Sequence, residues 1–165
     1  MWSFDRRNLI LGALALGGLA SCGFTPAYGP NGTATRLQNR ILVSEPSDRN
    51  SYLLTRHLET RLGRSASPEF GLNVTLELQE EGIAVTSTNI TARYNVIGKA
   101  AYELLDLSDG SVLTKGQVNS FTGYSATGST ASIQTAEADA YERLMVILGD
   151  QIVTRLIAAS GNLPE

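Results

Sequence analysis

The feature that most constrains the fold is a strict alternation of apolar and polar residues within residues 72–79. Successive side chains of a β-strand point to opposite faces of its sheet, so this alternation predicts a strand with one buried face and one wet face. Such a sheet needs a second layer on its apolar side and leaves the other side open to water. The buried positions are expected to be Leu72, Val74, Leu76 and Leu78.

Two longer strands are expected after this one. Two glutamates and a glycine at 80–82 predict a break, which a short strand follows through Val85. Residues 90–105 then form the longest alternating run, and residues 112–121 return from a turn of Ser, Asp and Gly. The apolar face of the longest strand is expected to hold Tyr94, Val96, Ala100, Tyr102 and Leu104.

The turn at 108–110 fixes how these two strands pair. A three-residue loop with Gly110 in the left-handed conformation keeps Lys115 off the apolar face. It also places Glu103 opposite Lys115, which is a favourable pair of charges. The other pairs expected in this register are Leu107 with Ser111 and Tyr102 with Val112.

Two amphipathic helices complete the pattern. Asp48 or Asn50 can cap a helix that runs to about Leu62. Its leucines recur at i, i+4 and i+8, which makes one apolar stripe. A second, longer helix is expected over 133–159, after a mobile connection at 119–135 that is rich in Ser, Thr and Gly. The apolar stripe of this helix consists of Ala136, Ala140, Leu144, Leu148, Ile152 and Leu156.

The order of the elements defines the fold class. Residues 36–43 are interpreted as a first strand, and Pro46 ends it. The order is then strand, helix, three or four strands, and helix. We therefore predict an α+β fold of two layers, in which two amphipathic helices pack on one face of a mostly antiparallel four-stranded sheet. Residues 36–160 are expected to form this single domain.

The N-terminus has the composition of an export signal. Residues 1–8 include Arg6 and Arg7, and residues 9–20 are almost wholly apolar or small. A helix over 9–20 spans about 18 Å, which is too short for a bilayer core of about 30 Å. We therefore predict that residues 1–21 are a signal peptide that is removed. The arginine pair leaves two export routes open, the general secretory route and the twin-arginine route.

The single cysteine, Cys22, directly follows this segment. With a Leu and two small residues before it, Cys22 resembles the cysteine of a bacterial lipobox. The resemblance implies a thioether-linked diacylglycerol on the thiol and cleavage just before it. Two or more acyl chains anchor a protein durably, at about 0.8 kcal/mol per buried CH₂. Gly23 stands where an Asp tends to retain lipoproteins in the inner membrane, so outer-membrane delivery is favoured. The lipobox residues are Leu19, Ala20 and Ser21, and residues 22–35 are expected to be a tether between lipid and domain.

Few residue types suited to chemistry are present. One His and one Cys argue against a zinc site, and we predict no metal. His57 lies beside Leu54 and Leu58 in the predicted helix, so we expect it at the edge of the packed face. Glu80 and Glu81 are expected to mark a solvated turn. The chain has no nucleophile motif, phosphate-binding loop or dinucleotide fingerprint, so we predict neither an enzyme nor a cofactor. The net charge of −3 gives no case for nucleic-acid binding.

Three basic residues of the predicted strands are candidates for contact with an anionic lipid or with a protein partner. Arg93 and Lys99 share the wet face of the longest strand and have no predicted partner, so they suit contact with the phosphates of an anionic lipid or glycolipid. Ordinary solubility charge is the alternative interpretation. Lys115 has Glu103 as a predicted partner, and such a surface pair is worth roughly 0–1 kcal/mol.

Four motifs of the chain resemble those of one protein family. Residues 22–28, Cys-Gly-Phe-Thr-Pro-Ala-Tyr, resemble the Cys-Gly-Phe-x-Pro-x-Tyr opening of the alphaproteobacterial LPS-assembly lipoprotein LptE. Residues 91–100 resemble its central strand, residues 117–121 the strand before its last helix, and residues 136–144 the start of that helix. The resemblance covers most of residues 22–158, and the order and spacing of the motifs carry it.

The resemblance implies a fold, a partner and a place in the cell. LptE proteins pack two helices against a mostly antiparallel sheet, which agrees with the fold predicted above. They stand inside the lumen of the outer-membrane β-barrel LptD, help it assemble and plug it, and the pair places lipopolysaccharide in the outer leaflet. Some members bind lipopolysaccharide through basic residues near the sheet edge. Of the candidates here, Arg93 lies in a matched motif, and residues 120–135 contain no basic residue.

The resemblance therefore predicts a lipid-anchored outer-membrane protein that faces the periplasm. The alternative is a periplasmic lipoprotein that serves as an accessory subunit of another lipid-transport system.

Overall fold

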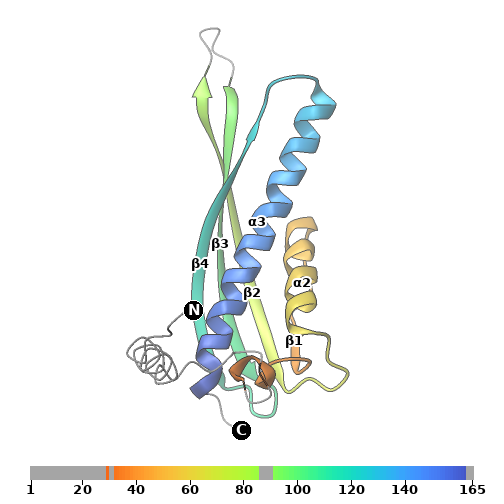
Figure 1. The fold of residues 1–165 in the computed structure, drawn as a ribbon, viewed down its shortest axis with the longest axis vertical. Helices are drawn as coiled ribbons and strands as arrows, with labels where there is room; N and C mark the ends of the chain where they lie inside the picture. The colour runs from red at the N-terminus through yellow and green to blue at the C-terminus, as the bar shows by residue number, and fades with distance from the viewer. Residues whose placement is uncertain (1–28, 30–31, 86–90, 163–165) are drawn as a thin grey trace, which may run out of the picture.

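The computed structural model describes residues 29, 32–85 and 91–162 (Figure 1). The predicted signal peptide, the lipobox and Cys22 lie outside these residues. The described residues form one sheet and two long helices, with a short 3-10 helix near either end. In chain order the elements are η1 (Thr33–Arg36), β1 (Ile41–Val43), α2 (Arg49–Leu62), β2 (Phe70–Val85), β3 (Thr91–Asp106), β4 (Val112–Ser125), α3 (Thr130–Ala159) and η2 (Ser160–Asn162).

The sheet has four strands in the order β1-β2-β3-β4. β1 runs parallel to β2, whereas the β2–β3 and β3–β4 pairs are antiparallel. α3 contacts β3, β4 and α2, and α2 also contacts β1. Figure 1 shows α3 running along the sheet with the shorter α2 beside it. The predicted two-layer α+β fold, with two helices on a mostly antiparallel sheet, is confirmed.

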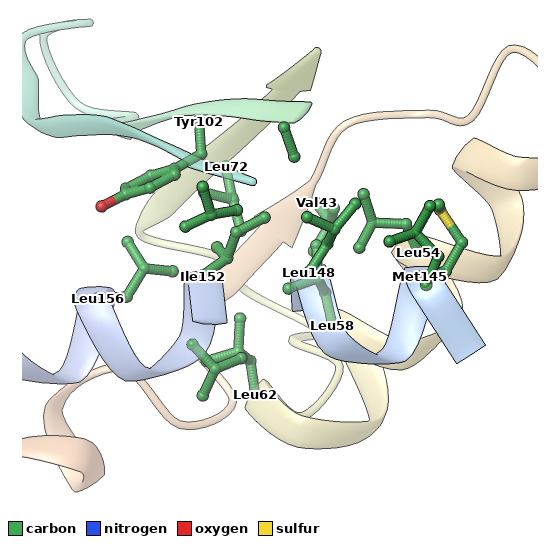
Figure 2. Packing of buried hydrophobic residues seen from close by; sticks show 14 of the residues in the cluster. Val43, Leu54, Leu58, Leu62, Leu72, Tyr102, Met145, Leu148, Ile152 and Leu156 are labelled. Atoms are coloured by element: carbon green, nitrogen blue, oxygen red, sulfur yellow. The ribbon is translucent and has the colours of Figure 1, made fainter. Parts of the chain in front are cut away.

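The core lies between the two helices and the even-numbered side chains of β3. Leu148 and Ile152 of α3 are fully buried, in one cluster with Leu72 and Tyr102 of the sheet (Figure 2). Gly98 of β3 lets α3 approach closely, because a Cβ atom there would lie 2.9 Å from Cδ1 of Leu148. The apolar face predicted for the longest strand is therefore the face that α3 covers.

α2 begins and ends where the sequence predicts. Asp48 is its N-cap and accepts hydrogen bonds from the N–H groups of Asn50, at 2.8 Å, and Ser51, at 2.9 Å. The bond from Ser51 is the largest cause that lowers the pKa of Asp48 below its ordinary value. Of the two predicted caps, Asp48 is thus the one used. The predicted stripe is confirmed, since its buried residues are Leu54, Leu58 and Leu62.

The β3–β4 turn has the predicted glycine conformation and charge pair. Gly110 has a φ of 74°, and its N–H donates to the carbonyl oxygen of Asp106 at 2.8 Å. Glu103 lies opposite Lys115, as predicted. The wet and apolar faces are therefore assigned correctly for the paired residues 93–104 and 114–121. Val112, which was expected on the apolar face, is 52% exposed.

Two details of the predicted pairing are wrong. The register shifts between Leu104 and Leu105, and the N–H of Asp106 donates to the carbonyl oxygen of Ser111 at 2.9 Å. The loop therefore contains Leu107, which the prediction had paired with Ser111. Tyr102 was expected to face Val112. In the structure Tyr102 lies opposite Gly116, and Val112 lies opposite Leu105.

The first strand is shorter than predicted. Residues 33–36 form η1, and β1 occupies only the last part of the predicted strand at 36–43. Asn39 interrupts the extended backbone, because its φ is 58° and its N–H donates to the carbonyl oxygen of Leu62 at 2.8 Å. Ala34, which the sequence places in the tether, is buried.

The predicted break at 80–82 and the predicted mobile connection at 119–135 are both wrong. β2 continues through residues 80–82 and absorbs its irregularity as register shifts between Gly82 and Val85. β4 continues to Ser125, since the buried hydroxyl of Thr122 donates to the carbonyl oxygen of Ala140 in α3 at 2.8 Å. The connection between β4 and α3 is therefore only 126–129.

Neither helix of this part of the chain is both long enough and apolar enough to cross a membrane.

Candidate functional site: the open face of the sheet

The side of the sheet that the helices leave uncovered is the candidate site. We call it the open face, and it consists of the odd-numbered side chains of 73–81 in β2, 93–103 in β3 and 115–125 in β4. None of these described side chains is buried. The face exists because every second residue of the three strands points away from α3.

The open face is polar and close to neutral. Three of its side chains are carboxylates and three are cationic at neutral pH. Gln79 donates to Oε1 of Glu81 at 3.0 Å, and amide side chains occupy several other positions. Such a surface offers many hydrogen-bond donors and acceptors and no strong field of either sign. The charged residues are Glu77, Glu81, Glu103, Arg93, Lys99 and Lys115.

The three predicted contact residues all lie on the open face but do not form one cluster. Arg93 and Lys99 are six residues apart on β3, which corresponds to about 20 Å along a strand. Lys115 lies on β4, beside Glu103. Lys99 was expected to have no partner, but it lies directly opposite Glu77 of β2. The arrangement is a row of separate cations, two of which have acidic neighbours, and not one phosphate pocket.

An exposed aromatic ring was missed in the sequence. Phe121 of β4 is 65% exposed and lies opposite Ile97 of β3, which in turn lies opposite Gln79. Together, Phe121 and Ile97 place an apolar spot within the polar surface. The signal was available, since Phe121 has the odd parity of the wet face in a strand whose three buried residues, Val118, Thr122 and Tyr124, are all even-numbered.

On the helix side, His57 joins the two helices. Its Nε2 atom lies 3.0 Å from Oδ1 of Asp150 in α3, and the guanidinium of Arg61 lies 3.5 Å from the same oxygen. The His57 side chain is 20% exposed. The predicted place of His57 at the edge of the packed face is confirmed, and its described contacts form an interhelical pair.

Glu80 was predicted to mark a solvated turn, and this prediction is wrong. Glu80 binds two tyrosines near the end of the sheet. Its carboxylate accepts a hydrogen bond from the hydroxyl of Tyr124 at 3.1 Å and one from the hydroxyl of Tyr141 at 3.4 Å. Tyr94 stacks on Tyr124 with ring centroids 5.4 Å apart. These contacts tie β2, β3, β4 and α3 together. The pKa of Tyr124 is raised well above its ordinary value. Burial is the largest cause, and the hydrogen bond to Glu80 is the next.

The described residues contain no group of three His, Cys, Asp or Glu side chains that could hold a metal ion. The geometry suits binding through a surface. Cys22 and the lipobox lie outside the described residues, so lipidation stays a prediction.

Comparison with protein families identifies a family that this chain matches. The family profile described as LptE, lipopolysaccharide-assembly, matches residues 38–156. A search of curated proteins returned no match.

Several solved structures share the fold. A candidate lipoprotein of Caulobacter crescentus is 20% identical, with a TM-score of 0.67 over 79% of this chain and 97% of that one. The rare lipoprotein B of Shewanella oneidensis is 12% identical, with a TM-score of 0.58 over 76% of this chain and 97% of that one. A minor lipoprotein of Acinetobacter baumannii is 12% identical, with a TM-score of 0.55 over 78% of this chain and 96% of that one. At these identities the likeness establishes the fold.

The tyrosine cluster predicts a loss of stability at high pH. Tyr124 has a raised pKa in the folded state and an ordinary pKa of about 10 in the unfolded chain. Its favourable contribution is complete below pH 10 and is lost as the pH rises further, because the unfolded chain releases the proton more readily. Tyr124→Phe should cost about 1 kcal/mol at pH 7 through the lost hydrogen bond. It should also flatten the fall in the free energy of unfolding above pH 10.

The measurement is urea denaturation between pH 7 and pH 11. Tyr52→Phe, at a residue that is 53% exposed, is the matched control and should keep the wild-type slope. If the free energy of unfolding of Tyr124→Phe fell above pH 10 as steeply as that of the wild type, the raised pKa of Tyr124 would be contradicted.

Proposed function

The chain belongs to the LptE family of lipopolysaccharide-assembly proteins, and on that basis we propose that it joins the outer-membrane β-barrel LptD, plugs its lumen and takes part in placing lipopolysaccharide in the outer leaflet. The match over residues 38–156 carries the proposal, because it spans the whole sheet and nearly all of α3. Members of this family are assembly lipoproteins and not enzymes.

The open face supports the proposal in physical terms. A large barrel has a polar, wet interior, so a plug must offer polar groups over an extended area. The open face is polar, nearly neutral and long in one direction, because three strands of 14 or 16 residues contribute to it. Hydrogen bonds over such a surface hold a partner in place without requiring a chemical step.

The contacts with lipopolysaccharide stay a prediction. Arg93, Lys99 and Lys115 lie along the open face at separate positions, so each could contact a phosphate only individually. Under the proposal, Arg93 is the first candidate, since it lies in a matched motif and has Ala84 and Ser125 as cross-strand neighbours.

Affinity purification tests the proposed partner. The tagged full chain is purified from detergent-solubilised envelopes, and the proteins that accompany it are identified and quantified by mass spectrometry. We expect LptD in near-equal amount, and we expect depletion of the chain to lower the amount of assembled LptD. An unrelated outer-membrane lipoprotein with the same tag is the control. Recovery of an inner-membrane lipid transporter in place of LptD, with normal barrel levels on depletion, would favour the accessory-subunit alternative and contradict the proposal.

The lipid anchor is proposed as well, with Cys22 as the acylated residue and residues 1–21 removed. The support is the position of Cys22 after an apolar segment and the small residues before it. Cys22→Ala should abolish acylation and processing, since no other thiol is present in the sequence. Intact-mass spectrometry should then find residues 1–21 retained and the acyl mass missing.

Ser21→Ala is the matched control for this variant, because alanine keeps a small side chain before the cysteine. It should be processed and acylated like the wild type. If Cys22→Ala were cleaved at the same bond and stayed equally bound to membranes, the lipid-anchor proposal would be wrong.

A further inference from the structure

β4 is the last strand of the sheet, and its outer edge is open. Among the described residues, β4 pairs with β3 and with no other strand. An open edge presents unpaired backbone N–H and C=O groups, which can pair with another extended chain.

The register identifies the outward groups. The N–H of Ala126 donates to the carbonyl oxygen of Ala92 at 2.9 Å, and one unshifted register runs from there down to the pair of Leu104 with Thr114. Alternate pairs of an antiparallel ladder exchange hydrogen bonds, so the even-numbered residues of this part of β4 bond to β3. The odd-numbered residues therefore direct their N–H and C=O groups outward. These residues are Lys115, Gln117, Asn119, Phe121, Gly123 and Ser125.

Near the C-terminal end of β4, an outward carbonyl group of this edge already has a partner. A guanidinium nitrogen of Arg143 in α3 donates to the carbonyl oxygen of Gly123 at 3.3 Å, which agrees with the outward direction assigned to that group. The stretch available for pairing is therefore 115–121.

Between residues 116 and 125, the edge of β4 lacks the features that usually protect an edge strand. Residues 116–125 include no charged residue and no proline, and their register has no shift. By contrast, the part of β2 that extends beyond β1 has glutamates at 77, 80 and 81 and an irregular register near Gly82. Proteins protect free edges with charges, prolines and bulges. A regular, uncharged edge over 116–121 is thus suited to pairing.

The edge is continuous with the open face. Gln117, Asn119 and Phe121 direct their side chains onto the open face and their backbone groups outward at the same time. A partner that lies against the open face therefore meets the edge as well. An added strand would place its own side chains beside Phe121, whose ring is 65% exposed.

We propose that the outer edge of β4, over residues 115–121, accepts an extended segment of the barrel protein as a fifth strand of the sheet. This inference rests on the proposed function. The strands of a closed barrel wall are already paired on both sides, so the segment must be a loop or a terminal stretch that reaches into the lumen. Backbone hydrogen bonds supply the affinity, and an uncharged or acidic segment matches an edge whose one charge is Lys115.

A proline in the edge tests the backbone pairing. Gln117→Pro removes an outward N–H group but no hydrogen bond to β3, which is the position where an edge strand tolerates proline. Gln117→Ala is the matched control, because it shortens the same side chain and keeps the N–H group. Both tagged full-length variants are purified from detergent-solubilised envelopes, and LptD recovery is quantified. We expect Gln117→Pro to lose LptD at least about tenfold relative to Gln117→Ala, because the two variants lack the same side chain and differ in the backbone N–H group.

The outcomes separate this inference from the proposed function. If the wild-type chain recovers no LptD, the proposed function fails and this inference fails with it. If the wild type and Gln117→Pro recover LptD equally, this inference alone is overturned.

A photo-cross-linking amino acid at Gln117, and separately at Asn119, gives a result that does not depend on the proline variant folding. Cross-links from both positions to one short segment of LptD would support the added strand. Cross-links to a second copy of this chain, or to scattered sites of the barrel wall, would overturn it.

Discussion

The packing of α3 along the even-numbered face of β3 and β4 is the contact on which the rest of the structure depends. Leu144, Leu148 and Ile152 are completely buried there, and Gly98 supplies the space that lets the helix approach. Burial of a leucine side chain contributes roughly 1.5–3 kcal/mol, so this stripe is a main source of stability. Because both helices lie on one side, the other side of the sheet has no cover within the described chain.

That one-sided arrangement suits a member of a family of assembly lipoproteins. The covered face supplies stability, and under the proposed function the open face and the edge of β4 supply hydrogen-bonding groups for a partner. Contacts between distant residues keep this surface in shape. The tyrosines that bind Glu80 lie 44 and 61 residues away from it in the sequence, and they hold β4 and α3 to β2. The strands of the open face are therefore held in place by side chains on the opposite face of the sheet.

Much of the fold could be predicted because local patterns and tertiary contacts agree. The cap at Asp48, the leucine stripe of α2 and the left-handed Gly110 each follow from local sequence. The length of β4 did not follow, since 119–125 is rich in Ser, Thr and Gly and is a strand because Thr122 and Tyr124 contact other elements. The candidate cations were assigned to the correct face by their parity. The position of Glu77 beside Lys99 could be found only from the register between β2 and β3.

Under the proposed function the partner covers the open face of the sheet, and labelling of the lysines on this face tests that contact. The only two lysines of the sequence, Lys99 and Lys115, both lie on this face. The full chain is treated with an amine-reactive reagent in detergent, alone and after purification with LptD, and modification of each lysine is quantified by mass spectrometry. We predict that both lysines react readily in the chain alone and are strongly protected in the complex. Equal modification of both lysines in the two samples would show that the partner does not cover the open face.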